Sequence, residues 1–272
     1  MRYDGRMGTR FFFFESFHCR VSIAGRGLGY TAEMITLAID TSERRGSVAV
    51  RKEGRRAALR RHESCEDYSS WLLPAVGACL GEGGVGMEGV ELLAVCTGPG
   101  SFTGVRVGLT TVKAWAEVHG KKVVGVSRLE AMARCAEAQA PIVAACYDAQ
   151  RGQMFAGMYR WRDGGLERIE EEMVVEAASF LRMATEEAGR ERIAWVTLDP
   201  ELITGAEGWK ARASIGDSMQ RVEGDLGDKI GEVAEERARK EQFTDPLELD
   251  ANYVRRSDAE IFWKGPTAGH GR

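Results

Sequence analysis

The sequence predicts an α/β protein with two lobes, of which the second is reduced, and three observations support this class. From Met34 onward, short apolar runs typical of buried strands alternate with segments whose apolar residues repeat at helical spacing. Asp40 and Asp148 each follow an apolar run and begin a polar, glycine-containing turn that leads into another strand, which indicates an internal duplication. The 272 residues also suffice for a sizeable core without disulfides or metal ions.

The first lobe is expected to open with a β-meander. Residues 35–39, 47–52 and 55–61 are predicted to form three strands separated by polar turns. A helix should follow and end at Gly81, and Pro74 is compatible with it only in the first turn or at a kink. The apolar residues that define this helix are Leu72, Leu73, Val76, Cys79 and Leu80.

A second helix is predicted where a buried strand at 91–96 leads into residues 97–104. Ser101 is a favourable N-cap, because its side chain can accept a backbone hydrogen bond, and Gly120 supplies the left-handed residue that closes the helix. The apolar stripe of the helix consists of Val105, Leu109, Val112 and Ala116.

After this helix, the pattern predicts a strand at 123–126 and another helix. A capping box, Ser127–Glu130, opens the helix, which we expect to run to about Glu137. Pro141 marks the expected boundary between the lobes. The first lobe is therefore assigned to residues 34–140.

The second lobe is assigned to residues 141–256. Residues 199–223 are rich in glycine and give no clear prediction, whereas 249–255 should form a strand or an extended segment. The other predicted elements are strands at 142–147, 153–161 and 193–198, a helix at 177–188, and a helix that carries Leu226, Ile230, Val233 and Ala234.

Both ends of the chain are predicted to lie outside the lobes. Residues 1–33 are interpreted as a disordered extension or a mis-assigned start, with Met34 as the functional beginning, because strand-like patterning first appears there. Phe11–Phe14 loosely imitate a secretory leader, but charged residues interrupt the apolar stretch and no small-residue cleavage site follows. Residues 257–272 are expected to be a polar, frayed tail.

The composition excludes several classes of protein. A net charge of -4 argues against a protein that grips nucleic acid by itself, because such binding needs a surplus of Lys and Arg on one face. The six cysteines show neither a disulfide framework nor zinc-ligand spacing, which favours free thiols in a cytoplasmic protein. No apolar run approaches the roughly 18 residues of a membrane helix.

The turn from Gly98 to Arg106 is the most informative segment. A glycine-rich turn between a strand and a helix N-terminus can direct backbone N–H groups at an anion. The alternative is that the glycines only permit a tight turn. The spacing matches neither the P-loop nor the dinucleotide-binding fingerprint. The candidate anion- or nucleotide-binding residues are Asp40, Thr41, Ser42, Gly98, Gly100, Ser101, Thr103, Gly104 and Arg106.

Asp40 and Asp148 occupy equivalent places at the ends of buried strands. In a two-lobed nucleotide-binding fold, such aspartates face a cleft and hold a metal-bound phosphate through water. The alternative is that each carboxylate caps its own turn, which is favoured for Asp148. The four histidines are not paired at i, i+4. The sequence therefore predicts no metal ligands and no catalytic residues.

Several motifs together carry a resemblance to a known family. Residues 34–42, Leu73–Pro74, 98–108, 124–127 and Asp148–Ala149 resemble the TsaB (YeaZ) family, the glycoprotease-like branch of the ASKHA superfamily. Near the end of the chain, the sequence Asn-Tyr-Val-Arg looks like a segment of the same family. The resemblance implies two ASKHA lobes, which are related to actin-like ATPases and RNase H.

The resemblance also implies a function. It indicates a non-catalytic subunit that dimerises with TsaD and activates it in the transfer of threonylcarbamoyl to tRNA adenosine (t6A37), with the ATPase TsaE completing the assembly. It implies tRNA contact only through this complex and no membrane contact, and it leaves open a homodimer of the free chain. No cofactor is firmly implied, and ATP or ADP remains an option. The chain has Tyr68 and Gln150 where many relatives have His and Arg, which leaves the function of those positions open.

The resemblance places a partner interface on the first-lobe helices at about 69–80 and 101–119. Large aromatics anchor interfaces, so Trp71 and Trp115 are candidates, although burial within the lobe is the alternative. The candidate interface residues are Trp71, Leu72, Val76, Leu109, Val112 and Trp115.

Two rival functions remain at this stage. One is an ATP-using phosphotransferase of the ASKHA superfamily, with Asp40 and the Gly98–Gly104 turn flanking the nucleotide. The other is a peptidase, which no triad or zinc motif in the sequence supports.

Overall fold

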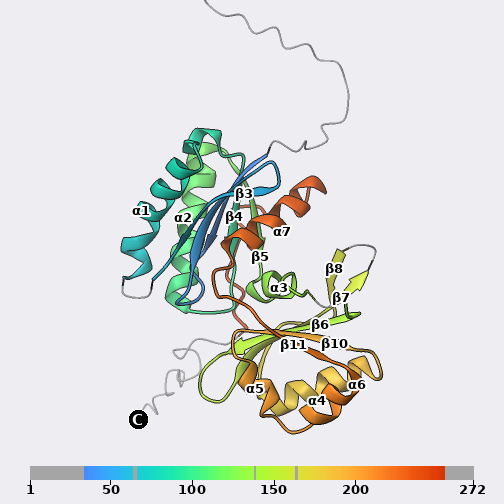
Figure 1. Cartoon of the computed structure of the whole chain (residues 1–272). Helices are drawn as coiled ribbons and strands as arrows, with labels where there is room; N and C mark the ends of the chain where they lie inside the picture. Colours follow the sequence, from blue (N-terminus) through green and yellow to red (C-terminus); the bar gives the residue numbers. More distant parts are fainter. Residues whose placement is uncertain (1–33, 64–65, 138, 163–164, 255–272) are drawn as a thin grey trace, which may run out of the picture.

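The computed structural model describes residues 34–63, 66–137, 139–162 and 165–254. It contains two β-sheets with helices on both faces of each (Figure 1). The predictions made for residues 1–33 and 257–272, and for Arg255, lie outside the described residues.

The first sheet has the strand order β3-β2-β1-β4-β5. β1, β2 and β3 form the predicted antiparallel meander, while β4 and β5 run parallel to β1. The strands span Ile35–Asp40 (β1), Ser47–Lys52 (β2), Arg55–Arg61 (β3), Leu92–Cys96 (β4) and Lys122–Val126 (β5). The central strands are buried on both sides, which explains their continuous apolar runs.

The second sheet repeats this order as β8-β7-β6-β10-β11. Again a meander is followed by two parallel strands, so the predicted duplication is confirmed at the level of connectivity. The strands span Ile142–Asp148 (β6), Met154–Arg162 (β7), Gly165–Arg168 (β8), Ile193–Thr197 (β10) and Ser218–Arg221 (β11), and Met173–Val175 (β9) pairs with β7 beside this path.

Helices cover both faces of the first sheet. α1 (Tyr68–Glu82) and α2 (Phe102–His119) lie on one face, and α7 (Gly227–Arg239) packs on the other (Figure 1). A 3₁₀ turn at Met87–Gly89 precedes β4. α2 begins and ends as predicted, because Ser101 accepts a hydrogen bond from the Gly104 N–H and Gly120 is left-handed.

The two lobes exchange one helix each. α3 (Arg128–Ala133) follows the last strand of the first sheet but packs on β6, β7 and β10 of the second. α7 follows the last strand of the second sheet but packs on the first. The far face of the second sheet carries α4 (Ala177–Ala188), α5 (Pro200–Thr204) and α6 (Trp209–Ile215). One apolar core therefore runs between the sheets and joins the lobes.

One local prediction was wrong, and the structure narrows three that were left open. The helix that begins at Ser127 ends at Ala133, before the predicted end at Glu137. Residues 199–223, for which there was no clear prediction, contain α5, α6 and β11, and the described part of 249–255 contains no strand, which leaves the predicted alternative of an extended segment. Pro74 lies in the interior of α1, which excludes the first turn and leaves the predicted alternative of a kink. The division of the chain at residue 141 stays a prediction.

Candidate functional site

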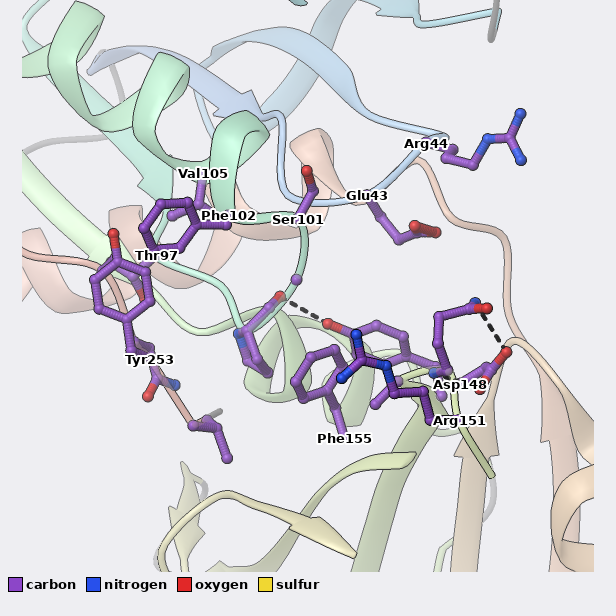
Figure 2. Close-up of a pocket in the computed structure, with 18 residues that line it drawn as sticks. Glu43, Arg44, Thr97, Ser101, Phe102, Val105, Asp148, Arg151, Phe155 and Tyr253 are labelled. Carbon is purple, nitrogen blue, oxygen red and sulfur yellow. Dashed lines mark hydrogen bonds between the residues drawn. The ribbon is translucent and has the colours of Figure 1, made fainter. Parts of the chain in front are cut away.

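A cavity of about 720 Å³ opens between the two lobes (Figure 2). The β1–β2 turn and the N-terminal end of α2 form its first-lobe wall, and the β6–β7 turn forms its second-lobe wall. The C-terminal segment, residues 249–254, closes a third side of the cavity through residues 251–254. Its lining residues are Glu43, Arg44, Thr97, Pro99–Phe102, Val105, Tyr147–Arg151, Phe155 and Ala251–Val254.

The glycines at the start of α2 are required by a close approach of two chain segments. The Ser101 N–H donates to the Ser42 carbonyl at 2.7 Å, and the Thr41 hydroxyl donates to the Gly104 carbonyl at 2.7 Å. A Cβ atom at Gly100 would lie 2.0 Å from the Ser42 carbonyl oxygen, and one at Gly104 would lie 2.1 Å from that of Thr41. Packing against the β1–β2 turn therefore explains these glycines without a ligand.

Asp40 lies beneath this turn and is fully buried. Its Oδ1 accepts from the Ser42 N–H at 2.9 Å and from the Ser42 hydroxyl at 2.6 Å, while its Oδ2 accepts from Arg128 Nη1 at 2.5 Å. Burial works to lower the pKa of Arg128, but Asp40 and the weaker acidic groups around it together raise the pKa above its ordinary value. Both oxygens of Asp40 are thus engaged, so the residue does not fit a metal-bound phosphate.

Tyr147 and Asp148 form the second-lobe wall. The Tyr147 hydroxyl donates to the Pro99 carbonyl at 2.7 Å and so ties the α2 turn to the second lobe. Burial raises the pKa of Tyr147 well above its ordinary value, so the hydroxyl stays protonated. Asp148 accepts from the Gln150 N–H at 2.7 Å and from the Gln150 side-chain amide at 3.0 Å, which is the turn-capping role favoured from the sequence (Figure 2).

Tyr68, a position where the resemblance leads us to expect histidine, does not line this cavity. Its hydroxyl accepts from the Gly46 N–H at 2.8 Å and donates to the Glu43 carbonyl. Burial raises its pKa above the ordinary value. His62 stacks beside it, with ring centroids 4.3 Å apart. Tyr68 therefore fixes the β1–β2 turn from the side of α1.

The structure does not bring all nine candidate anion-binding residues together. Gly100 and Ser101 line the cavity, whereas Thr103 and Arg106 line a groove on the other side of α2. The five that line neither are Asp40, Thr41, Ser42, Gly98 and Gly104. Anion or nucleotide binding at this turn stays a prediction.

The candidate interface residues on α1 and α2 divide into two groups. Trp71 and Trp115 are partly buried and pack against the core below them. The other four point into that core and pack on the sheet, with 5% or less of their surface exposed: Leu72, Val76, Leu109 and Val112. These four therefore contribute mainly to the core of the lobe, and the partner interface on these helices stays a prediction.

Other side chains form the outer face of these helices. Leu73 is 58% exposed and Phe102 is 41% exposed, and both line a groove of about 500 Å³ between α1 and α2. Gly77 and Gly81 are exposed one and two turns after Leu73. Sequence reasoning missed these residues, although the i, i+4 spacing of Leu73, Gly77 and Gly81 was a usable signal.

A second, polar cavity of about 420 Å³ lies at the junction of the lobes. Glu172 accepts from the hydroxyl of Tyr159 at 2.6 Å, from that of Ser127, and from the Asn252 amide. Nearby, Glu130 pairs with Arg237 at 2.6 Å, yet burial outweighs this pairing and raises the pKa of Glu130. The cluster ties α3, β7 and the C-terminal segment together, and no pattern in the sequence predicts it.

The part of the chain that the structure describes was searched for metal-binding clusters and for membrane-spanning helices. Within these residues, no three His, Cys, Asp or Glu side chains are placed to share a metal ion. None of the helices found there combines the length and apolar character that crossing a bilayer requires.

Comparison with known proteins identifies relatives. A family model described as TsaD, tRNA N6-adenosine threonylcarbamoyltransferase, matches residues 62–201. The tRNA threonylcarbamoyladenosine biosynthesis protein TsaB of Bacillus subtilis is 29% identical over 85% of this chain and 98% of its own length. The Escherichia coli protein of the same name is 30% identical over 67% of this chain and 75% of its own length. The structure of YeaZ from Pseudomonas aeruginosa superposes with a TM-score of 0.65 at 24% identity, over 81% of this chain and 99% of that one.

The repeated sheet order, the exchanged helices and the cavity between the lobes define a two-lobed α/β protein of the ASKHA type. Within that class, the TsaB and YeaZ relatives narrow the assignment to one family. The chain belongs to the TsaB (YeaZ) family.

Proposed function

We propose that this chain is a non-catalytic subunit in the biosynthesis of tRNA N6-threonylcarbamoyladenosine and that it acts by docking onto a TsaD-type enzyme and activating it. TsaE would join the assembly, and tRNA would be modified by the assembled complex in the cytoplasm. Family membership supports the pathway. The docking role is supported by the outer face of α1 and α2.

The observation that carries the proposal is the chemistry of α1. Its sequence contains no charged residue from Tyr68 to Gly81. The exposed positions before its last residue are Ser69, Ser70, Leu73, Pro74, Gly77, Ala78 and Gly81. A helix face exposed to water normally carries charged side chains, so this face has the composition of a surface that another protein covers.

Two glycines strengthen this argument. A Cβ atom added at Gly77 or Gly81 would meet nothing within 4 Å, so packing inside the chain does not require either glycine. Each exposed glycine in a helix interior costs about 1 kcal/mol relative to alanine. Glycine at such positions lets a second helix approach closely, which supports docking by helix packing.

The rival functions are less well supported. A phosphotransferase would need Asp40 for a metal-bound nucleotide, but Arg128 and Ser42 already engage both carboxylate oxygens. A peptidase would need a free base. The ring nitrogens of His62 each lie 2.8 Å from a backbone carbonyl oxygen, so both face the protein's own backbone rather than a substrate.

The proposal is tested by reconstitution with the TsaD and TsaE of the same organism. The chain should form a complex with TsaD and should restore threonylcarbamoyl transfer that TsaD and TsaE lack on their own. Gly77→Lys should abolish both complex formation and activation, while leaving the chain folded, because lysine favours a helix more than glycine does.

Ala178→Lys is the matched control, because Ala178 is an exposed small residue of α4 on the second lobe. It should leave association and activation unchanged. Undiminished transfer by TsaD and TsaE without this chain, or a Gly77→Lys variant that still binds and activates, would contradict the proposal.

A further inference from the structure

Two segments that are far apart in the sequence meet at the N-terminal end of α2. The rings of Phe102 and Tyr253 lie with their centroids 5.2 Å apart (Figure 2). The Arg106 guanidinium stacks 3.7 Å from the centroid of the Phe102 ring, and its Nε donates to the Tyr253 hydroxyl at 2.9 Å. We call these three residues the aromatic–arginine cluster.

The C-terminal segment is anchored on both sides of the lobe junction, which holds Tyr253 in the cluster. Leu249 is buried in the first-lobe core. The Asn252 N–H donates to the Thr97 carbonyl at 2.8 Å, and the Asn252 side chain donates to Glu172. Despite these anchors, Tyr253 remains 43% exposed and Phe102 41% exposed. The chain thus fixes two aromatic rings at the surface.

Arg106 carries a charge that no carboxylate neutralises within the described part of the chain. Its Nε bonds to Tyr253, and neither terminal Nη group takes part in a hydrogen bond or ion pair there. Other arginines near the protein surface, such as Arg60 and Arg160, pair with glutamates. Because stacking already restricts the guanidinium, binding an anion would cost it little further entropy.

The cluster continues the outer face of α1 and α2. Phe102 and Arg106 line the same groove as Leu73, so a protein that covers this face reaches the cluster as well. Aromatic side chains and arginine are the residues that most often dominate the energy of interfaces. The cluster therefore has the chemistry of an interface anchor.

We propose that the aromatic–arginine cluster is the charged end of the docking surface, where the partner protein places an Asp or Glu carboxylate against the Nη groups of Arg106 between Phe102 and Tyr253. This inference rests on the proposed function, because it uses the same face of α1 and α2. An acidic protein side chain is favoured over an RNA phosphate, since RNA binding needs several cations and the neighbouring cavity has no surplus of them: Glu43 and Asp148 balance Arg44 and Arg151.

The test measures the affinity of the full-length chain for TsaD by calorimetry. Arg106→Glu should weaken binding about tenfold or more, because it removes a charge-assisted pair and places two carboxylates together. Tyr253→Leu should weaken binding more than Tyr253→Phe, which keeps the ring. Arg182→Glu is the matched control, because Arg182 is exposed on α4. Thermal unfolding should confirm that each variant is folded.

The outcomes separate this inference from the proposed function. A wild-type chain that does not bind TsaD overturns both. If Gly77→Lys abolishes binding while Arg106→Glu binds like the wild type, the proposed function stands and the anchor is overturned. If Arg106→Glu lowers photo-crosslinking of tRNA to this chain in the assembled complex without changing its affinity for TsaD, the site is an RNA contact and the inference is equally overturned.

Discussion

The two lobes share a strand order but differ in the helices that cover their outer faces. In the first lobe, α1 and α2 have 15 and 18 residues, and the exposed face of α1 is uncharged until its last residue, Glu82. In the second lobe, the outer helices have 12, 5 and 7 residues. Their exposed surface carries charged residues, among them Arg182, Glu186, Glu187 and Lys210.

This difference shows how a duplicated fold can divide its tasks. The second-lobe helices have the surface of elements that face water, because charged side chains keep their hydration there. In the first lobe, α1 combines a buried stripe with an uncharged outer face, which a helix that faces only water does not need. We infer that the first lobe carries the docking surface and that the second lobe mainly holds the first in place.

The largest expected effects on the free energy of unfolding come from substitutions in one buried ion pair of each lobe. Arg212 pairs with Asp217 in the second lobe through two bonds of 2.9 Å and also donates to two backbone carbonyls, whereas the Nε of Arg128 has no partner. Arg212→Met and Arg128→Met should each lower the free energy of unfolding by about 3–5 kcal/mol, because an unpaired buried carboxylate remains. Urea unfolding measures both changes.

These variants also test whether the exchanged helices join the lobes. Because α3 and α7 each pack on the sheet of the other lobe, both variants should unfold in one transition. Arg128→Met combined with Asp40→Asn should recover part of the loss. Two separate transitions for Arg212→Met would show instead that the second lobe unfolds independently.

The next effect distinguishes the inner from the outer face of the first-lobe helices. Gly104→Ala should destabilise the chain by about 1–3 kcal/mol, because its Cβ would meet the Thr41 carbonyl. Gly77→Ala should instead stabilise the free chain by up to about 1 kcal/mol. Thermal unfolding measures both, and a loss of stability for Gly77→Ala would mean that this glycine has a role within the chain.

A smaller effect concerns how helices begin in the two lobes. Ser101 caps α2 through its hydroxyl, whereas Glu176 precedes α4 without a side-chain capping bond. Ser101→Ala should therefore cost about 1 kcal/mol. Glu176→Ala should change stability by less than about 0.5 kcal/mol. Equal losses for the two variants in urea unfolding would refute the difference in capping.

The smallest expected effect is a pH dependence at the junction of the lobes. Burial raises the pKa of Glu130 above its ordinary value of 4.5, even though Arg237 opposes the shift. Between these two pKa values the folded state binds more protons than the unfolded state, so stability from this residue should increase as the pH falls through that window. Glu130→Gln should remove this slope from unfolding measurements across the acidic range. An unchanged slope would contradict the assignment.

Periodicity predicted most of the elements because each strand or helix buries one repeating face. The strand at β4, the helix α2 and its caps at Ser101 and Gly120 were all predicted from residues within a few positions of one another. α5, α6 and β11 were missed because they are 4 to 7 residues long and give too short a pattern. The buried and the exposed face of α1 could not be told apart from the sequence, because neither face carries a charge before Glu82.

The sequence by itself determined the α/β class, the duplicated meander and membership of a family through the Gly98–Gly108 motif, because these depend on local spacing along the chain. Only the tertiary structure decided that the motif's glycines serve contact with Thr41 and Ser42, and that Tyr253 joins Phe102 and Arg106. The physical reason is that such contacts join residues separated by about 60 to 150 positions, and no local pattern records which distant atoms will share a buried or exposed surface.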